Sequence, residues 1–101
     1  MPRYIRREQK VTTMLDVTIY TTASCPYCIR AKALLRKRKL SFREIAVDDD
    51  PEARQEMTVR AHGRKTVPQI FFNGVRIGDS DELHELDRTG ELDKIVAGLA
   101  R

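Results

Sequence analysis

The clearest structural signal in the sequence is the Asn73-Gly74 pair, which separates two short apolar runs. The runs cover residues 67–72 and 75–77. An Asn-Gly pair between two such runs is the strongest short-range signal for a β-hairpin with a two-residue turn. We therefore expect an antiparallel pair of strands here, and Gly78 should end the second strand.

A strand followed by a helix is predicted near the start of the chain. Residues 17–20 are β-branched or aromatic and predict the strand. Pro26 suits the first turn of a helix because its φ angle is already fixed, and Ser24 is placed to cap that helix. The side chains that should face the core from this helix are those of Ile29, Ala33, Leu34 and Leu35.

The other elements follow a similar pattern. Residues 41–47 predict a second strand, and the acidic run that ends at Pro51 predicts the start of a second helix, which Gly63 closes. After the hairpin, Ser80 should cap a third helix, and a fourth should follow Gly90. The core-facing side chains of these three helices should be Ala53, Met57 and Ala61, then Leu83 and Leu86, and finally Leu92, Ile95, Val96 and Leu99.

The predicted order of elements is therefore β-α-β-α-β-β-α-α. The first two strands, which a helix joins, should be parallel with a right-handed crossover. The hairpin adds an antiparallel pair. The result is an α/β fold, a four-stranded mixed sheet flanked by helices, which is the thioredoxin-like architecture. A chain of 101 residues has room for one such domain. We expect it to span residues 15–101, after a mobile basic leader over residues 1–14.

The formal net charge of +4 lies mainly in the leader, because residues 1–15 carry +3 of it. The rest of the chain is nearly neutral, so we expect no nucleic-acid partner. The basic cluster over residues 36–39 lies where a helix should end, and the helix dipole favours cations there. No apolar run approaches the roughly 18 residues of a membrane span, and the polar N-terminus lacks a signal-peptide pattern. We expect a cytoplasmic protein that does not contact membranes.

The two cysteines, Cys25 and Cys28, form a Cys-Pro-Tyr-Cys motif at the start of the first helix. Free N–H groups and the positive end of the helix dipole favour a thiolate at Cys25, so its pKa should fall below the free-thiol value. Cys28 lies one helical turn deeper and can reach a mixed disulfide on Cys25. Only His62 and His84 could complete a zinc site, and their spacing does not fit one, so we expect no metal. The motif favours redox chemistry.

Two further segments could form a binding groove beside the cysteines. The loop Thr66-Val67-Pro68 leaves extended backbone groups free to pair with a peptide, and a cis bond at Pro68 would turn it toward Cys25. The alternative is that Pro68 simply begins an ordinary edge strand and has no role in binding. The turn from Gly78 into the next helix presents N–H groups that can bind a carboxylate. The alternative is that this turn is an ordinary helix cap with no ligand.

Three motifs together resemble the dithiol glutaredoxins, most closely the bacterial glutaredoxin 3 type. They are Cys-Pro-Tyr-Cys, Thr-Val-Pro-Gln-Ile-Phe and Ile-Gly-Asp-Ser-Asp-Glu-Leu, and the resemblance covers roughly residues 16–98. It implies a glutathione-dependent thiol-disulfide oxidoreductase that reduces protein disulfides and glutathione mixed disulfides. Cys25 would be the nucleophile and Cys28 the resolving thiol. The glutathione-binding residues implied are Tyr27, Arg64, Thr66, Val67, Pro68, Gly78, Ser80 and Asp81.

The resemblance also assigns parts of glutathione to parts of this site. Val67 would pair with the cysteinyl backbone, Ser80 and Asp81 would hold the γ-glutamyl carboxylate, and Arg64 could face the glycyl carboxylate. Two positions depart from the family pattern: Thr22 stands where many members have Lys, and Asp79 follows Gly78 where Gly-Gly is usual. The first removes a cation from the site, and the second adds a carboxylate near it.

The resemblance implies a monomer that binds glutathione as reductant and co-substrate, with no permanently bound cofactor. Its partners would be disulfide-bonded or glutathionylated proteins, among them ribonucleotide reductase. Two alternatives remain open: a thioredoxin-like carrier reduced by a flavoprotein reductase, and a dimer that binds an iron-sulfur cluster through the Cys25 thiolates and glutathione. Pro26 and Tyr27 argue against the dimer, because cluster-binding glutaredoxins tend to have a less rigid motif.

Overall fold

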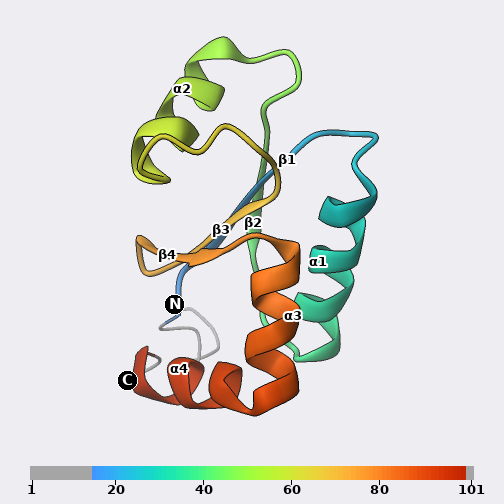
Figure 1. The fold of residues 1–101 in the computed structure, drawn as a ribbon, viewed down its shortest axis with the longest axis vertical. Coiled ribbons are helices and arrows are strands. Elements are labelled where there is room, and N and C mark those ends of the chain that lie inside the picture. The colour runs from blue at the N-terminus through green and yellow to red at the C-terminus, as the bar shows by residue number, and fades with distance from the viewer. Residues whose placement is uncertain (1–14, 100–101) are drawn as a thin grey trace, which may run out of the picture.

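A four-stranded mixed sheet lies at the centre of the structure, a computed structural model that describes residues 15–99 (Figure 1). Its strands stand in the order β2-β1-β3-β4. β1 pairs parallel with β2 and antiparallel with β3, and β3 and β4 form the hairpin. The strands are β1 (Val17–Thr21), β2 (Arg43–Ala46), β3 (Gln69–Phe72) and β4 (Val75–Gly78). The expected leader over residues 1–14 lies outside the described residues.

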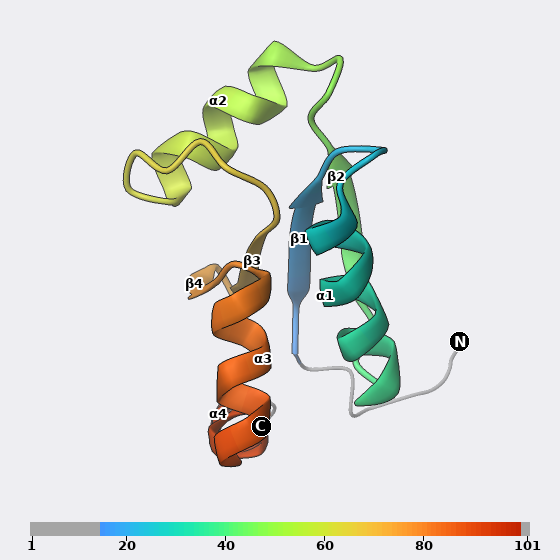
Figure 2. The ribbon, with the colours of Figure 1, turned by 45° about the vertical axis from the view of Figure 1, so that its right-hand side comes forward.

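Four helices flank the sheet, in the order that the sequence predicts. They are α1 (Pro26–Lys37), α2 (Pro51–Arg60), α3 (Ser80–Thr89) and α4 (Glu91–Leu99). α1 and α3 lie side by side on one face of the sheet, and α2 lies apart from them (Figures 1 and 2). No helix within residues 15–99 is long and apolar enough to cross a membrane. The expected mixed sheet flanked by helices is confirmed.

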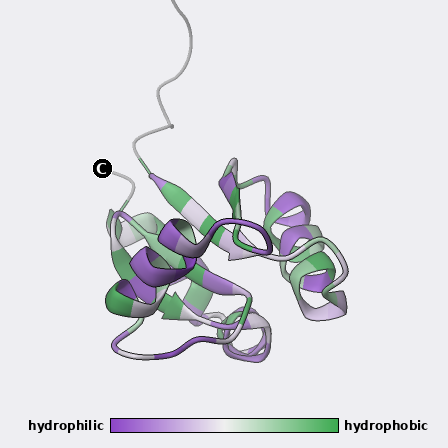
Figure 3. Cartoon of the chain, turned by 90° about the horizontal axis from the view of Figure 1, so that it is seen from above, coloured by the Kyte–Doolittle hydropathy of each residue, from purple (hydrophilic) through white to green (hydrophobic). Residues whose placement is uncertain are grey.

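The sheet separates two hydrophobic clusters because successive side chains of a strand point to opposite faces. On one face, Val17 and Ile19 of β1 pack with buried residues of α1, α3 and α4. On the other, Tyr20 packs with the expected inner face of α2 and with Phe71, whose ring meets it edge to face at 5.7 Å. Hydrophilic and hydrophobic residues alternate along the helices (Figure 3). This pattern is typical of helices that pack one face against a sheet and expose the other.

The hairpin is confirmed, and its turn also fastens the start of β1. Asn73 and Gly74 have φ angles of 52° and 83°, the positive values that a two-residue hairpin turn of this kind requires. The Asn73 backbone N–H donates to Asp16 O at 2.7 Å, and the Asp16 N–H donates to Asn73 Oδ1 at 2.8 Å. The turn that sets the register of β3 and β4 therefore also holds the start of β1 in place.

The predicted inner face of α1 is partly wrong. Leu34 and Leu35 are buried as expected, but Ile29 is 57% exposed and Ala33 is also exposed. Cys28 and Ala31 are buried in their place. Each residue advances about 100° around a helix, so the burial of Cys28 turns its neighbour Ile29 toward solvent.

The orientation of α1 gives a direct test of stability. Leu35→Ala should destabilise the fold by about 2–5 kcal/mol, because Leu35 is fully buried and its loss leaves a cavity. Ile29→Ala on the same helix is the matched control and should change the free energy of unfolding by less than about 0.5 kcal/mol. Urea unfolding of both variants measures the difference. Equal losses would mean that α1 is rotated relative to the sheet.

Candidate active site

Cys25 lies at the N-cap of α1, with its sulfur at the positive end of the helix. Its Sγ accepts a hydrogen bond from the backbone N–H of Cys28 at 3.2 Å. The expectation that Ser24 caps this helix is wrong: the cysteine side chain takes the capping role itself. The backbone N–H and the positive end of the helix dipole both favour negative charge that develops on a sulfur at this position. Cys25 is also partly exposed, so the sulfur is accessible to a substrate.

Cys28 has the opposite environment, although it lies only three residues further along α1. Its side chain is 1% exposed, within the core of the domain. Burial, which costs the thiolate its hydration, and a hydrogen bond with Cys25 together raise the pKa of the Cys28 thiol to about 12. The pair therefore combines one accessible sulfur with a second that stays protonated beneath it.

The Val67-Pro68 loop faces the cysteines, as expected. The peptide bond between Val67 and Pro68 is cis. Val67 O lies 3.8 Å from Cys25 Sγ, within hydrogen-bonding range for a thiol. The loop thus brings an extended backbone segment beside the reactive sulfur.

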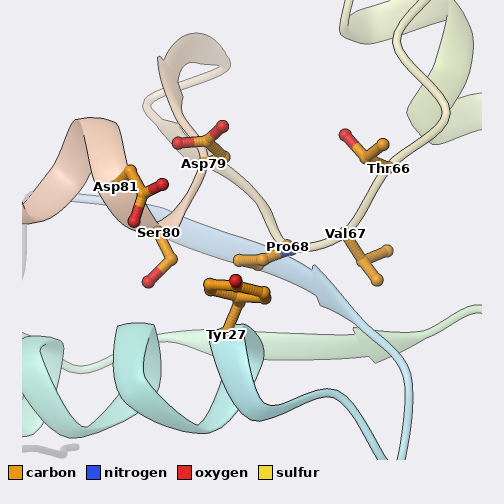
Figure 4. Close-up of a pocket in the computed structure, with 7 residues that line it drawn as sticks. All are labelled: Tyr27, Thr66, Val67, Pro68, Asp79, Ser80 and Asp81. Carbon is orange, nitrogen blue, oxygen red and sulfur yellow. The ribbon is translucent and has the colours of Figure 1, made fainter.

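A groove of about 260 Å³ opens next to this loop. Figure 4 shows Tyr27 of α1 below Pro68, with Thr66 and Val67 toward one end and the first residues of α3 toward the other. The Tyr27 ring is 53% exposed and forms one rim. The lining residues are Tyr27, Thr66, Val67, Pro68, Asp79, Ser80 and Asp81. None of these side chains carries a positive charge.

The N-terminus of α3 forms one wall of the groove, and its cap is Asp79, not Ser80 as the sequence suggested. Asp79 Oδ1 accepts the Glu82 N–H at 2.9 Å, and Glu82 Oε1 accepts the Asp79 N–H at 3.0 Å, which completes a capping box. The extra carboxylate that departs from the family pattern is thus engaged by its own helix. Ser80 is the first residue of α3 and is buried.

Gly78 precedes this cap in a conformation that only glycine adopts readily. Its φ angle is 146°, and a Cβ at this position would lie 2.6 Å from the Cβ of Glu82. A side chain at position 78 would therefore push Glu82 out of the capping box.

Most of the predicted glutathione-binding residues come together, but two of them do not line the groove. Tyr27, Thr66, Val67, Pro68, Ser80 and Asp81 line it, whereas Arg64 and Gly78 do not. Arg64 is exposed in the loop after α2, and its backbone N–H donates to Ala61 O. Asp79 lines the groove although the sequence identified it only as a departure from the family pattern. The Asp-x-x-Glu spacing of residues 79–82 was the signal that could have identified it as a cap.

Comparison with known proteins agrees with this geometry. The family model described as Glutaredoxin matches residues 17–77. A protein named "Glutaredoxin" from Pseudomonas aeruginosa is 50% identical over 84 residues, which cover 83% of this chain and 99% of that protein. "Glutaredoxin 3" from Escherichia coli is 48% identical over 83 residues, which cover 82% and 99% of the two chains.

Solved structures of glutaredoxins have the same fold. The solution structure of glutaredoxin from Brucella melitensis superimposes with a TM-score of 0.72 at 48% identity, and the match covers 83% of this chain and 90% of that one. The crystal structure of a buckwheat glutaredoxin-glutathione complex gives a TM-score of 0.73 at 26% identity, over 89% and 86% of the two chains. The resemblance drawn from the three motifs is confirmed. The chain belongs to the glutaredoxin family of thiol-disulfide oxidoreductases.

Proposed function

We propose that Cys25 is the nucleophile of this glutaredoxin and that Cys28 is its resolving thiol. The observation that carries the proposal is the contrast between the two sulfurs. Cys25 Sγ is accessible and receives a backbone N–H, whereas Cys28 is buried and has a raised pKa. Because a thiolate is the attacking species in disulfide exchange, the first attack falls to Cys25.

Reduction of a protein disulfide then proceeds in two exchanges. The Cys25 thiolate attacks one sulfur of the substrate, the substrate S–S bond breaks, and the other sulfur leaves and takes up a proton. Cys28 gives up its proton and attacks Cys25 Sγ, which releases the second substrate thiol and leaves a Cys25–Cys28 disulfide. Two glutathione molecules return the enzyme to the dithiol form and leave as one glutathione disulfide, so two electrons are transferred in each cycle.

The groove suits the glutathione part of a mixed disulfide on Cys25. The N-terminus of α3 at Ser80 and Asp81 presents backbone N–H groups to the γ-glutamyl carboxylate. The extended backbone of Val67, 3.8 Å from Cys25 Sγ, would pair with the cysteinyl residue. The buckwheat glutaredoxin solved as a complex with glutathione supports glutathione as the ligand.

The substrates are disulfide-bonded or glutathionylated proteins, of which ribonucleotide reductase is one candidate by family resemblance. The enzyme would act as a cytoplasmic monomer and would need no permanently bound cofactor, because glutathione supplies the electrons.

Exchanging each cysteine for serine tests the two roles. Cys25→Ser should abolish all thiol transfer, because no other thiol is accessible among the described residues. Cys28→Ser should still deglutathionylate a peptide but lose the reduction of protein disulfides, which needs the resolving thiol. Glutathione-coupled turnover with glutathione reductase measures both reactions. If Cys25→Ser kept deglutathionylation and Cys28→Ser lost it, the roles would be reversed.

The buried thiol predicts an unusual pH dependence. In Cys25→Ser protein, Cys28 can react with iodoacetamide only when the structure opens transiently. Its slow alkylation rate should keep rising to about pH 10, roughly tenfold for each pH unit, because burial holds its pKa above the ordinary value of about 8.5. The same protein unfolded in denaturant is the control, and its rate should level off near pH 9. A plateau at the same pH in folded and unfolded protein would contradict the raised pKa.

Arg64 remains the candidate for the glycyl carboxylate of glutathione, because Thr22 supplies no charge there. We expect Arg64→Ala to raise the Michaelis constant for glutathione about threefold to tenfold, a modest effect because the side chain is exposed. Thr22→Lys should lower it, and both effects should shrink at higher salt. Lys94→Ala, in α4, is the control. An unchanged constant in Arg64→Ala would point to Lys65 or to backbone donors instead.

A further inference from the structure

A chain of hydrogen bonds links Thr66 to Asp79, and these bonds are partly buried at Gln69 and exposed at Glu82. Gln69 begins β3 and is fully buried. Its amide nitrogen donates to Thr66 O at 3.1 Å and lies 3.4 Å from Thr66 Oγ1. Its amide oxygen accepts Arg76 Nε at 2.8 Å. Because an acceptor lies on one side and a donor on the other, both ends of the amide are satisfied in this orientation only.

Arg76 continues the chain toward α3. It lies in β4, an edge strand, yet its side chain is only 13% exposed. Its Nη2 group donates to Glu82 Oε1 at 3.0 Å. The same oxygen accepts the backbone N–H of Asp79 at 3.0 Å. The guanidinium therefore ends directly on the capping box of α3.

These contacts connect the two ends of the groove. Thr66 lines it from the loop before β3, and Asp79 lines it from the start of α3. We propose that Arg76 is a positioning residue for glutathione, which holds the Thr66 wall and the Asp79 wall at a fixed separation through Gln69 and Glu82. We call these five residues the groove bridge. Arg76 itself is not among the residues that line the groove, so it acts through the others.

The chemistry of arginine suits this role better than that of any other side chain. A planar guanidinium offers several N–H donors in a fixed geometry, so it can serve an amide oxygen and a carboxylate at once. A lysine ammonium could satisfy the charge of Glu82 but would not span both acceptors in the same geometry. Gly78 contributes by its missing side chain, because it leaves room for Glu82 to reach both partners.

The inference rests on the proposed assignment of the groove to glutathione, and its test separates the two. Arg76→Met keeps the length of the side chain and removes all its donors. We expect kcat/KM for a glutathionylated peptide to fall about fivefold, because KM rises while kcat stays unchanged. A fivefold change corresponds to the net contribution of about one hydrogen bond to binding. Single-turnover reduction of a peptide disulfide that lacks glutathione should be unaffected. A merely structural role would slow both reactions.

Three further variants complete the test. Arg88→Met removes an arginine that is paired with Glu85 on α3 and lies outside the groove bridge, and it should leave both reactions unchanged. Arg76→Lys keeps the charge and should give a smaller rise in KM than Arg76→Met; it also serves if Arg76→Met does not fold. Asp81→Asn tests the groove itself: it removes the negative charge that can pair with the ammonium group of the γ-glutamyl residue, beside the bound carboxylate, so it should raise the same KM.

The outcomes are distinct. If Asp81→Asn raises KM but neither Arg76 variant does, the groove assignment stands and the role of Arg76 is overturned. If Asp81→Asn and both Arg76 variants leave KM unchanged, glutathione does not use this groove, and the proposed site and the inference both fail. If the Arg76 variants slow both reactions equally, Arg76 supports the fold in general and not the groove.

Discussion

The active site depends on the antiparallel pairing of β1 with β3. In this pairing Tyr20, near the end of β1, lies opposite Gln69, at the start of β3. The chain that leaves β1 leads directly to Cys25, and the chain that enters β3 comes directly from the Val67-Pro68 loop. Backbone hydrogen bonds in the centre of the sheet thus bring together two segments that are 42 residues apart in the sequence.

The same arrangement explains why two identical side chains behave differently. A helix that begins at the edge of the sheet presents its first N–H groups outward, while its first full turn already packs against the sheet. Cys25 lies at that N-cap and Cys28 at that packed turn. The proposed division of roles between the cysteines therefore follows from where α1 meets the sheet.

The order of elements and most of the residues that line the groove could be predicted from the sequence. The Asn73-Gly74 turn, the inner face of α2 and the order of elements depend on short-range patterns, and these expectations were confirmed. The caps were wrong because Ser24 and Ser80 are good capping residues with better-placed neighbours, Cys25 and Asp79. The role of Arg76 had no sequence signal, because a charged residue on an edge strand normally faces water and only the tertiary structure turns it inward.

The side chain of Asn73 has one more partner, since its amide nitrogen lies 3.3 Å from the carbonyl of Leu99 in α4. With its bonds to Asp16, the hairpin turn gathers the two ends of the described chain at the edge of the sheet where β1 begins, and the cysteines follow the opposite edge. A fluorescent protein, an affinity handle or a second enzyme joined directly at residue 15 or residue 99 would therefore sit away from the reactive sulfur. Residues 15–99 are thus suited to use as a redox module in fusions, because both of these attachment points lie at the end of the sheet opposite the cysteines.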